Sequence, residues 1–243
     1  MFPQIWLSPT TLNMVKDCHR CMWEHILWKQ KRPQGPFPTL PRGVDDAQKT
    51  YCDQYRGVLA PSLKALAAQE PSLMEYSLHK DLRWMNSLRD WKGGLSTTIT
   101  FGSQKYRVSG AVDDLLVRDS DGALAILDGK SKAKKPEAGE GLKYYGTQMD
   151  TYDLLIRKSG LDSAGVAYLW YLVPVSMEDR DILLPNPTVN IVFDQFVQKI
   201  EVSGDRSMAL IEEVHKMVVD HTDRTKPPAA GSNCEYCAWA GRS

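Results

Sequence analysis

The order of helix-like and strand-like segments along the chain predicts a mixed α/β fold. Helical patterns come first, three strand-like segments follow, and a helix, two more strands and a last helix complete the sequence. This order fits a central mixed β-sheet flanked by helices, and it fits neither an all-helical bundle nor a β-sandwich. With 243 residues, 42% of them hydrophobic, the chain can also bury a sizeable core.

Two helical segments are expected before the first strand. A serine–proline pair, typical of a helix N-terminus, precedes apolar residues at helical spacing, so residues 9 to about 30 are predicted to be largely helical. Four prolines in residues 31–43 predict a linker, because closely spaced prolines prevent regular helix. A second helix is expected from Val44 to about Gln69, and Pro61 marks a place where it can be interrupted.

The pattern then changes to strands, which are rich in β-branched and apolar residues and separated by turn residues. The predicted strands and helices, in chain order, are strands at 95–101, 104–117 and 123–127, a helix at 142–160, strands at 166–175 and 189–202, and a helix at 206–221. We therefore expect one domain spanning 1–243, with a helical N-terminal region (1–94), a core (95–205) and a C-terminal helix with a cysteine motif (206–243).

The third predicted strand becomes charged where it ends. Its apolar residues are followed at once by Asp128 and Lys130, and these two share one face because side chains alternate along a strand. The turn sequence RDSDG before the strand predicts an antiparallel hairpin with the preceding strand. The chemistry of the strand end therefore depends on which residue of the preceding strand lies opposite.

The loop of this hairpin sets its register. A two-residue loop at 120–121 places Asp113 opposite Asp128, and a loop one residue later places Asp113 opposite Lys130. A three-residue loop would bring Asp114 to this face instead.

Two carboxylates that face each other beside a core are destabilising unless positive charge lies between them. Lys130 supplies part of that charge, and a divalent cation held by Asp113, Asp128 and a backbone carbonyl, that of Gly129, would supply the rest. Such a metal polarises a phosphoryl oxygen and generates hydroxide, while the lysine stabilises developing negative charge. The pattern predicts phosphodiester hydrolysis; the alternative is an ordinary strand end with solvated charges.

Three motifs in order resemble the RecB-like branch of the PD-(D/E)XK nuclease superfamily. The pattern of that branch is G-x-[IV]-D, an apolar strand that ends in D-x-K-[TS], and a helix with Q-x-x-x-Y. Here these motifs correspond to residues 110–113, 128–131 and 148–152. The resemblance implies a restriction-endonuclease-like core and a deoxyribonuclease that depends on Mg²⁺ or Mn²⁺.

The resemblance also implies a role for each matching residue. Asp113 and Asp128 would bind the metal, Lys130 would be the catalytic lysine, and Gln148 and Tyr152 would complete the site on the side that faces DNA. Independently of the family, the last two are four residues apart and so share one face of a helix.

Many members of this branch carry one more metal ligand, a histidine or glutamate, on the preceding helix. This chain has no G-x-x-x-H motif, and the nearest match is RGVDDAQK at 42–49, where Asp45 is the candidate ligand. The alternative for Asp45 or Asp46 is a helix N-cap.

Two C-x-x-C pairs lie more than 200 residues apart, Cys18 with Cys21 and Cys234 with Cys237. Such pairs present four thiolates to one tetrahedral ion or one cluster, and here they would join the two ends of the fold. Nucleases of this branch, of the AddB and CRISPR-associated types, carry an iron–sulfur cluster with one N-terminal and three C-terminal cysteines. A [4Fe–4S] cluster is therefore expected, with Zn²⁺ as the alternative because this chain offers two and two. Cys52 is expected to be a packed thiol.

Zero formal net charge means that a nucleic-acid partner would be held by a local basic patch. The densest basic run is KSKAKK at 130–135, followed by Lys143, and lysines of this kind contact phosphates without reading sequence. Tyr144 and Tyr145 can stack on the bases of a single strand. The alternatives are a solvated loop and a tyrosine in the core. The expected substrate is DNA, single-stranded or at ends, bound without sequence specificity.

The N-terminal sequence lacks the features of a signal peptide, and no stretch approaches about 18 consecutive apolar residues, so a cytoplasmic protein without a membrane partner is expected. The predicted activity is exonucleolytic hydrolysis of DNA. Two other functions remain open: a catalytically inactive DNA-binding subunit with the nuclease fold, and a structural zinc-binding protein.

Overall fold

The computed structural model describes residues 2–33, 39–90, 94–181 and 188–242. Its elements, in chain order, are β1 (Ile5–Leu7), α1 (Pro9–Asp17), α2 (His19–Trp28), α3 (Thr39–Asp53), α4 (Pro61–Leu66), a short 3₁₀ helix η1 (Pro71–Glu75), β2 (Tyr76–Leu78), α5 (Leu82–Leu88), β3 (Leu95–Phe101), β4 (Gln104–Gly110), β5 (Asp114–Arg118), β6 (Leu124–Ser131), α6 (Glu140–Lys158), β7 (Ser163–Asp181), β8 (Thr188–Glu201), α7 (Gly204–Asp220) and α8 (Glu235–Trp239).

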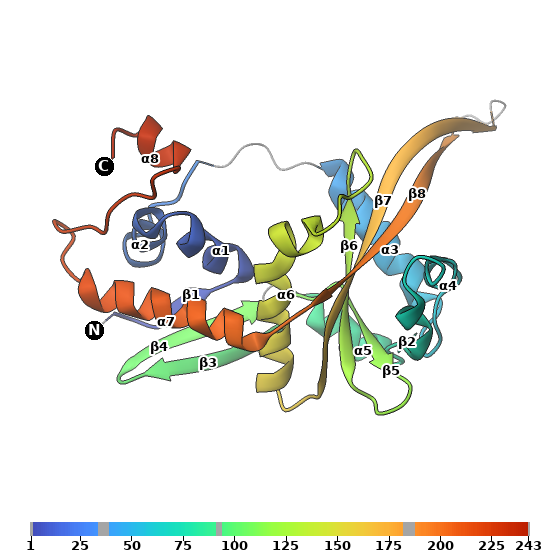
Figure 1. Ribbon diagram of the computed structural model, residues 1–243, viewed down its shortest axis with the longest axis horizontal. Coiled ribbons are helices and arrows are strands. Elements are labelled where there is room, and N and C mark those ends of the chain that lie inside the picture. Colours follow the sequence, from blue (N-terminus) through green and yellow to red (C-terminus); the bar gives the residue numbers. More distant parts are fainter. Residues whose placement is uncertain (1, 34–38, 91–93, 182–187, 243) are drawn as a thin grey trace.

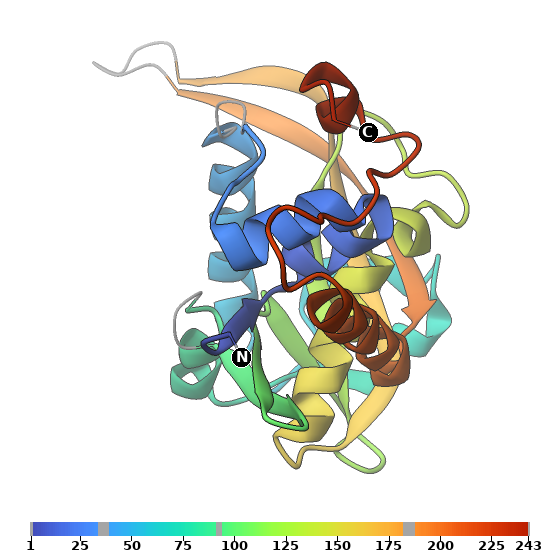
Figure 2. The same cartoon turned by 90° about the vertical axis from the view of Figure 1, so that its left-hand side faces the viewer.

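The strands form two sheets with helices packed around them (Figure 1). The central sheet has the order β2-β5-β6-β7-β8, in which β6 and β7 are parallel and the other neighbours antiparallel. The smaller sheet has the order β1-β4-β3. After α7 the chain runs back past α1 and α2 to reach α8 (Figure 2). The predicted mixed sheet flanked by helices is confirmed.

The central sheet is buried on both faces. Along β6, Leu124 and Ile126 belong to one apolar core, which also contains side chains of α6 and α7. Ala125 and Leu127 belong to a second core, which contains side chains of α3 and α4. Because side chains alternate along a strand, Asp128 lies on the same face as Ile126, toward α6. Gly129 lies on the opposite face with Leu127, toward α3. The end of β6 therefore lies between these two helices.

Several predicted elements are confirmed. The strand predicted at 95–101 is β3, the helices predicted at 142–160 and 206–221 are α6 and α7, and the strands predicted at 166–175 and 189–202 are β7 and β8. None of the helices in the described part of the chain is long and apolar enough to cross a membrane.

The single strand predicted at 104–117 is wrong, because the structure has two strands there. β4 ends at Gly110, β5 begins at Asp114, and they belong to different sheets. The ring of Tyr152 packs on Gly110 so closely that a Cβ at this position would lie 2.7 Å from the ring atom Cε1. Where β4 ends, Gly110 is therefore required for a contact with α6 that the β-rich local sequence does not reveal.

The strand predicted at 123–127 is longer than expected. β6 continues to Ser131 because it pairs with β7 residue by residue as far as Leu172. Asp128 and Lys130 consequently lie inside a strand with a fixed backbone and not in a loose segment after it.

The helix predicted at 44–69 is two helices, α3 and α4. α3 begins at Thr39, within the linker predicted at 31–43, since Pro41 falls in its first turn, where backbone N–H groups need no intrahelical partner. Residues 34–38 of the predicted linker lie outside the described residues.

Candidate active site

β6 carries a buried ion pair at its end. Asp128 is fully buried, and its carboxylate pairs with the ammonium group of Lys130, which is largely buried on the same face. Burial raises the pKa of Asp128, the charge of Lys130 lowers it and Asp113 raises it, with a net value of about 7. Burial lowers the pKa of Lys130, but the neighbouring carboxylates outweigh this effect and raise it, so the lysine stays charged.

The register of the hairpin is the one set by a loop around 120–121. Asp114 pairs with Leu127, and the next pairs follow in step, which places Asp113 opposite Asp128. The Oδ2 atom of Asp113 accepts a hydrogen bond from the backbone N–H of Gly129 at 3.3 Å. The register that is one residue later, and the three-residue loop that would turn Asp114 to this face, are therefore wrong.

α6 brings an amide to the ion pair. Gln148 Nε2 donates to Asp128 Oδ1 at 3.2 Å and to the hydroxyl of Tyr152 at 2.9 Å, and its Oε1 accepts from Lys130 Nζ at 3.3 Å. Burial raises the pKa of Tyr152 well above its usual range, so its hydroxyl is neutral. The amide of Gln148 thus holds the carboxylate and the ammonium in fixed positions.

α3 brings a second carboxylate and a second lysine to the same place. Lys49 Nζ lies 2.6 Å from Asp45 Oδ2 and 2.9 Å from Asp113 Oδ1, so it bridges the two acids. Burial and the charge of Asp113 raise the pKa of Asp45. The N-cap alternative for Asp45 and Asp46 is wrong, because α3 begins at Thr39 and both lie inside the helix.

A buried network that the sequence reasoning missed fixes the position of Asp113. Arg56 donates to both carboxylate oxygens of Asp114, at 2.7 and 2.6 Å, and also pairs with Asp53 at the end of α3. Arg89, just after α5, pairs with the same two acids and donates from Nε to the backbone carbonyl of Asp113 at 2.8 Å. The network ties the helix that carries Asp45 to the segment that carries Asp113. Its only local signal in the sequence is the spacing of Asp53 and Arg56, which suits one helical turn.

The four predicted cysteines come together where the segment after α7 meets α2. The sulfur of Cys21 lies 3.6 Å from that of Cys234 and 3.5 Å from that of Cys237, and the sulfurs of Cys18 and Cys237 are 3.7 Å apart. The ligand atoms of all four cysteines lie within 4.8 Å of one another. Within the described residues, no other group of three or more histidine, cysteine or acidic side chains is this compact. Four clustered cysteines fit a bound metal.

Hydrogen bonds to sulfur favour the thiolate form of Cys18, whereas burial raises the pKa of Cys21 to about 11 and also raises that of Cys237. Cys18 separates α1 from α2 and caps α2, and its sulfur accepts from the backbone N–H groups of Cys21 and Gly231, at 3.5 and 3.2 Å. Burial raises the pKa of Cys18, but these bonds lower it to about 7. Arg32 donates to the sulfur of Cys234 at 3.4 Å. A Cβ on Gly231 would lie 2.3 Å from the carbonyl of Asp17, so the close approach of the two chain segments needs glycine there.

Comparison with protein families gives one match. The family model described as the PD-(D/E)XK nuclease superfamily matches residues 17–242, which include both cysteine pairs and every residue of the acidic site. No curated protein matches the chain.

Proposed function

Because the chain belongs to the PD-(D/E)XK nuclease superfamily, we propose that it is a metal-dependent deoxyribonuclease. The observation that carries the proposal is the convergence of three elements on one point. β6 supplies Asp128 and Lys130, the segment before β5 supplies Asp113, and α6 supplies Gln148, which contacts both β6 residues. A carboxylate pair beside a charged, positioned lysine suits hydrolysis of a phosphodiester.

The acids of this site suit a divalent cation such as Mg²⁺ or Mn²⁺. Carboxylate oxygens are the ligands that such hard cations prefer, and Asp45 and Asp113 already hold a positive charge between them in the form of the Lys49 ammonium group. When bound, the metal would polarise the phosphoryl group and activate water. The side chains of this chain do the rest: Lys130 stays charged beside the reacting phosphate, and Gln148 holds it in place.

A basic surface beside the site supports a nucleic-acid substrate. Lys132, Lys134, Lys135 and Lys143 line a pocket formed by the loop after β6 and the first turn of α6, together with Glu137 and with Glu140, which pairs with Lys132. Lysines at such a place bind phosphates of any sequence. We infer that the strand passes along this loop, and that cleavage is exonucleolytic and proceeds from single-stranded ends.

Purified protein is expected to degrade linear single-stranded DNA with Mg²⁺ or Mn²⁺, and not in excess chelator, because the acids alone cannot activate water. Gel analysis of end-labelled linear DNA and of circular single-stranded DNA measures the activity and its dependence on ends. If the protein binds DNA but does not cleave it, whichever divalent cation is added, the result contradicts the proposal and favours an inactive DNA-binding subunit. Absence of both binding and cleavage, with zinc present, would favour a structural zinc-binding protein.

We propose Asp45 as the third metal ligand; its carboxylate and those of Asp113 and Asp128 are not all within 4.8 Å of one another, so a bound cation would draw the three together. Asp45→Asn is expected to weaken Mn²⁺ binding about tenfold or more, measured by isothermal titration calorimetry, because a neutral amide replaces one negatively charged oxygen ligand. Asp46→Asn is a matched control: Asp46 is the next residue on α3, its carboxylate is exposed, and its ion-pair partner is the exposed Arg42. Equal Mn²⁺ affinity in the two variants would remove Asp45 from the ligand set.

The spacing of the cysteine sulfurs supports a single tetrahedral ion, preferably Zn²⁺. A tetrahedral ion with metal–sulfur bonds of about 2.3 Å separates its sulfur ligands by about 3.8 Å. The closest sulfur pairs in the cysteine cluster are 3.5, 3.6 and 3.7 Å apart. The [4Fe–4S] cluster that the resemblance implies is larger, because each cysteine sulfur binds a different iron atom, and its sulfur ligands therefore stand farther apart than those of a single ion. The cation of Arg32 beside Cys234 offsets part of the negative charge that four thiolates leave on a divalent ion.

A further inference from the structure

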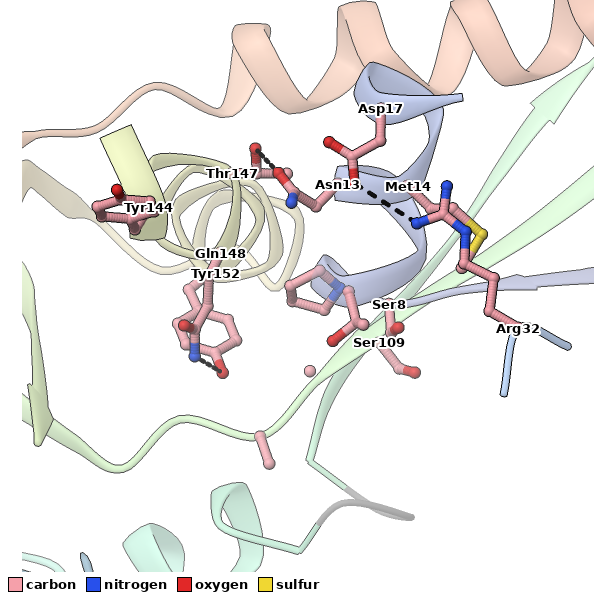
Figure 3. Close-up of a pocket in the computed structure, with 14 residues that line it drawn as sticks. Ser8, Asn13, Met14, Asp17, Arg32, Ser109, Tyr144, Thr147, Gln148 and Tyr152 are labelled. Atoms are coloured by element: carbon pink, nitrogen blue, oxygen red, sulfur yellow. Dashed lines mark hydrogen bonds and ion pairs between the residues drawn. The ribbon is translucent and has the colours of Figure 1, made fainter. Parts of the chain in front are cut away.

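A second pocket opens beside the proposed catalytic residues. It has a volume of about 570 Å³ and lies between α1, α6 and the end of β4 (Figure 3). Gln148 and Tyr152 form part of its wall, and the same Gln148 amide contacts Asp128 and Lys130. A group bound in this pocket would therefore lie one side chain away from the reacting phosphate.

The side chains around the pocket are mostly uncharged. From α1 and β4 come short hydrogen-bonding groups, among them Ser8, Asn13 and Ser109. The Oδ1 atom of Asn13 accepts a hydrogen bond from Thr147 at 3.2 Å, which leaves its NH₂ group to donate to a ligand (Figure 3). The pocket thus offers neutral donors and acceptors at fixed places.

Charge in the pocket is already paired, and an aromatic ring stands at its edge. Arg32 Nη1 lies 3.8 Å from Asp17 Oδ2 and its Nη2 donates to Cys234 Sγ at 3.4 Å, so its charge is shared between these two partners (Figure 3). A phosphate would need unpaired cations, whereas a nucleobase needs neutral hydrogen-bonding groups and a flat apolar surface. The ring of Tyr144, 58% exposed, supplies such a surface. The chemistry of the pocket fits a base and not a phosphate.

Tyr144 also connects the pocket to the basic surface. Its ring lines both this pocket and the neighbouring pocket of lysines, and Lys143 Nζ lies 5.1 Å from the centre of the ring. A strand whose phosphates follow the lysines would place one base past Tyr144 and next to Gln148, the side chain that contacts Lys130.

We propose that this pocket, lined by Asn13, Tyr144 and Gln148, binds one unpaired nucleobase of the strand that is cleaved. The proposal rests on the proposed nuclease function and specifies its substrate: a base in a duplex has its hydrogen-bonding edge occupied and its faces stacked, so only a single strand or a frayed end can supply the base. A volume of about 570 Å³ is in the range of pockets that enclose one small ligand.

Single-stranded oligonucleotides of one sequence, each with one abasic residue at a different position, test the base pocket. With wild-type protein and Mn²⁺, cleavage is expected to slow about tenfold at one fixed offset from the abasic residue, because loss of the base removes its stacking. Tyr144→Ala is expected to slow cleavage of the intact strand by a similar factor and to abolish the effect of the abasic residue. Trp6→Ala is the control, because Trp6 is equally exposed at 60% and lies outside the pocket.

Binding of the same oligonucleotides in Ca²⁺, measured by fluorescence anisotropy, separates the two proposals. Base-dependent binding without cleavage in Mg²⁺ or Mn²⁺ would overturn the nuclease function and leave the base pocket in place. If the cleavage rate and the binding affinity are the same for the intact strand and for every abasic strand, the base pocket is overturned and the nuclease function stays in place. Additive effects of Tyr144→Ala and the abasic residue would also overturn the pocket.

Discussion

Asp128→Asn is expected to lower the rate of DNA cleavage at least about a thousandfold while the protein stays folded. Asp128 is fully buried on the central sheet, and its carboxylate is the common partner of Lys130 and Gln148. A neutral amide at this position cannot balance the charge of a divalent cation, and it also leaves Lys130 without its main counter-charge. Cleavage rates with saturating Mn²⁺, together with circular dichroism to monitor folding, measure the effect.

A control and a second variant make this experiment specific. Asp119→Asn changes an exposed carboxylate in the turn of the same hairpin and is expected to leave the rate unchanged. Lys130→Met is expected to lose activity while it keeps Mn²⁺ affinity, because the lysine stabilises charge and does not bind the metal. If the Asp128→Asn variant cleaves DNA at a rate within tenfold of the wild-type rate, the site around Asp128 is not the catalytic site.

Removal of the metal from the cysteine cluster is expected to lower the free energy of unfolding by at least about 3 kcal/mol, because the binding energy of a structural zinc ion contributes directly to folding. A thiol-reactive mercurial is expected to release one zinc ion per chain. Cys237→Ser is expected to prevent zinc binding and to produce a similar loss of stability in urea unfolding. Cys52→Ala is the control, because Cys52 lies in the core between α3 and the central sheet and is not part of the cluster.

The same preparation distinguishes the possible occupants of the cysteine cluster. Broad absorbance at about 400 nm, together with about four iron atoms per chain, would show that the cysteines bind a [4Fe–4S] cluster and not zinc. Protein with neither metal, and with the unfolding free energy of the Cys237→Ser variant, would contradict both.

Local rules were enough to bring the acids of β6 and its partner strand together. Alternation along a strand puts Asp128 and Lys130 on one face, and a short turn leaves few registers for Asp113, of which the structure has one. Helical spacing likewise puts Gln148 and Tyr152 on one side of α6. Each of these relations joins residues that are close in sequence or related by a single tight turn.

Relations that depend on distant contacts were not accessible from the sequence. One such relation is the packing of Tyr152 on Gly110, where β4 ends. The pairing of Arg89 with Asp53 and Asp114 joins three separate elements, and no local pattern indicates which arginine pairs with which acid. Asp45 reaches Asp113 only through the packing of α3 on the central sheet.

The position of Cys18 links the two ends of the described chain to the pocket beside Gln148. Cys18 is both the C-cap of α1 and the N-cap of α2, and it lies in the cysteine cluster together with residues that follow α7. α1 in turn forms one wall of the pocket beside Gln148. Opening of the cluster is therefore expected to loosen that wall, and hydrogen-exchange protection of α1 is expected to fall when the cysteines lose their metal.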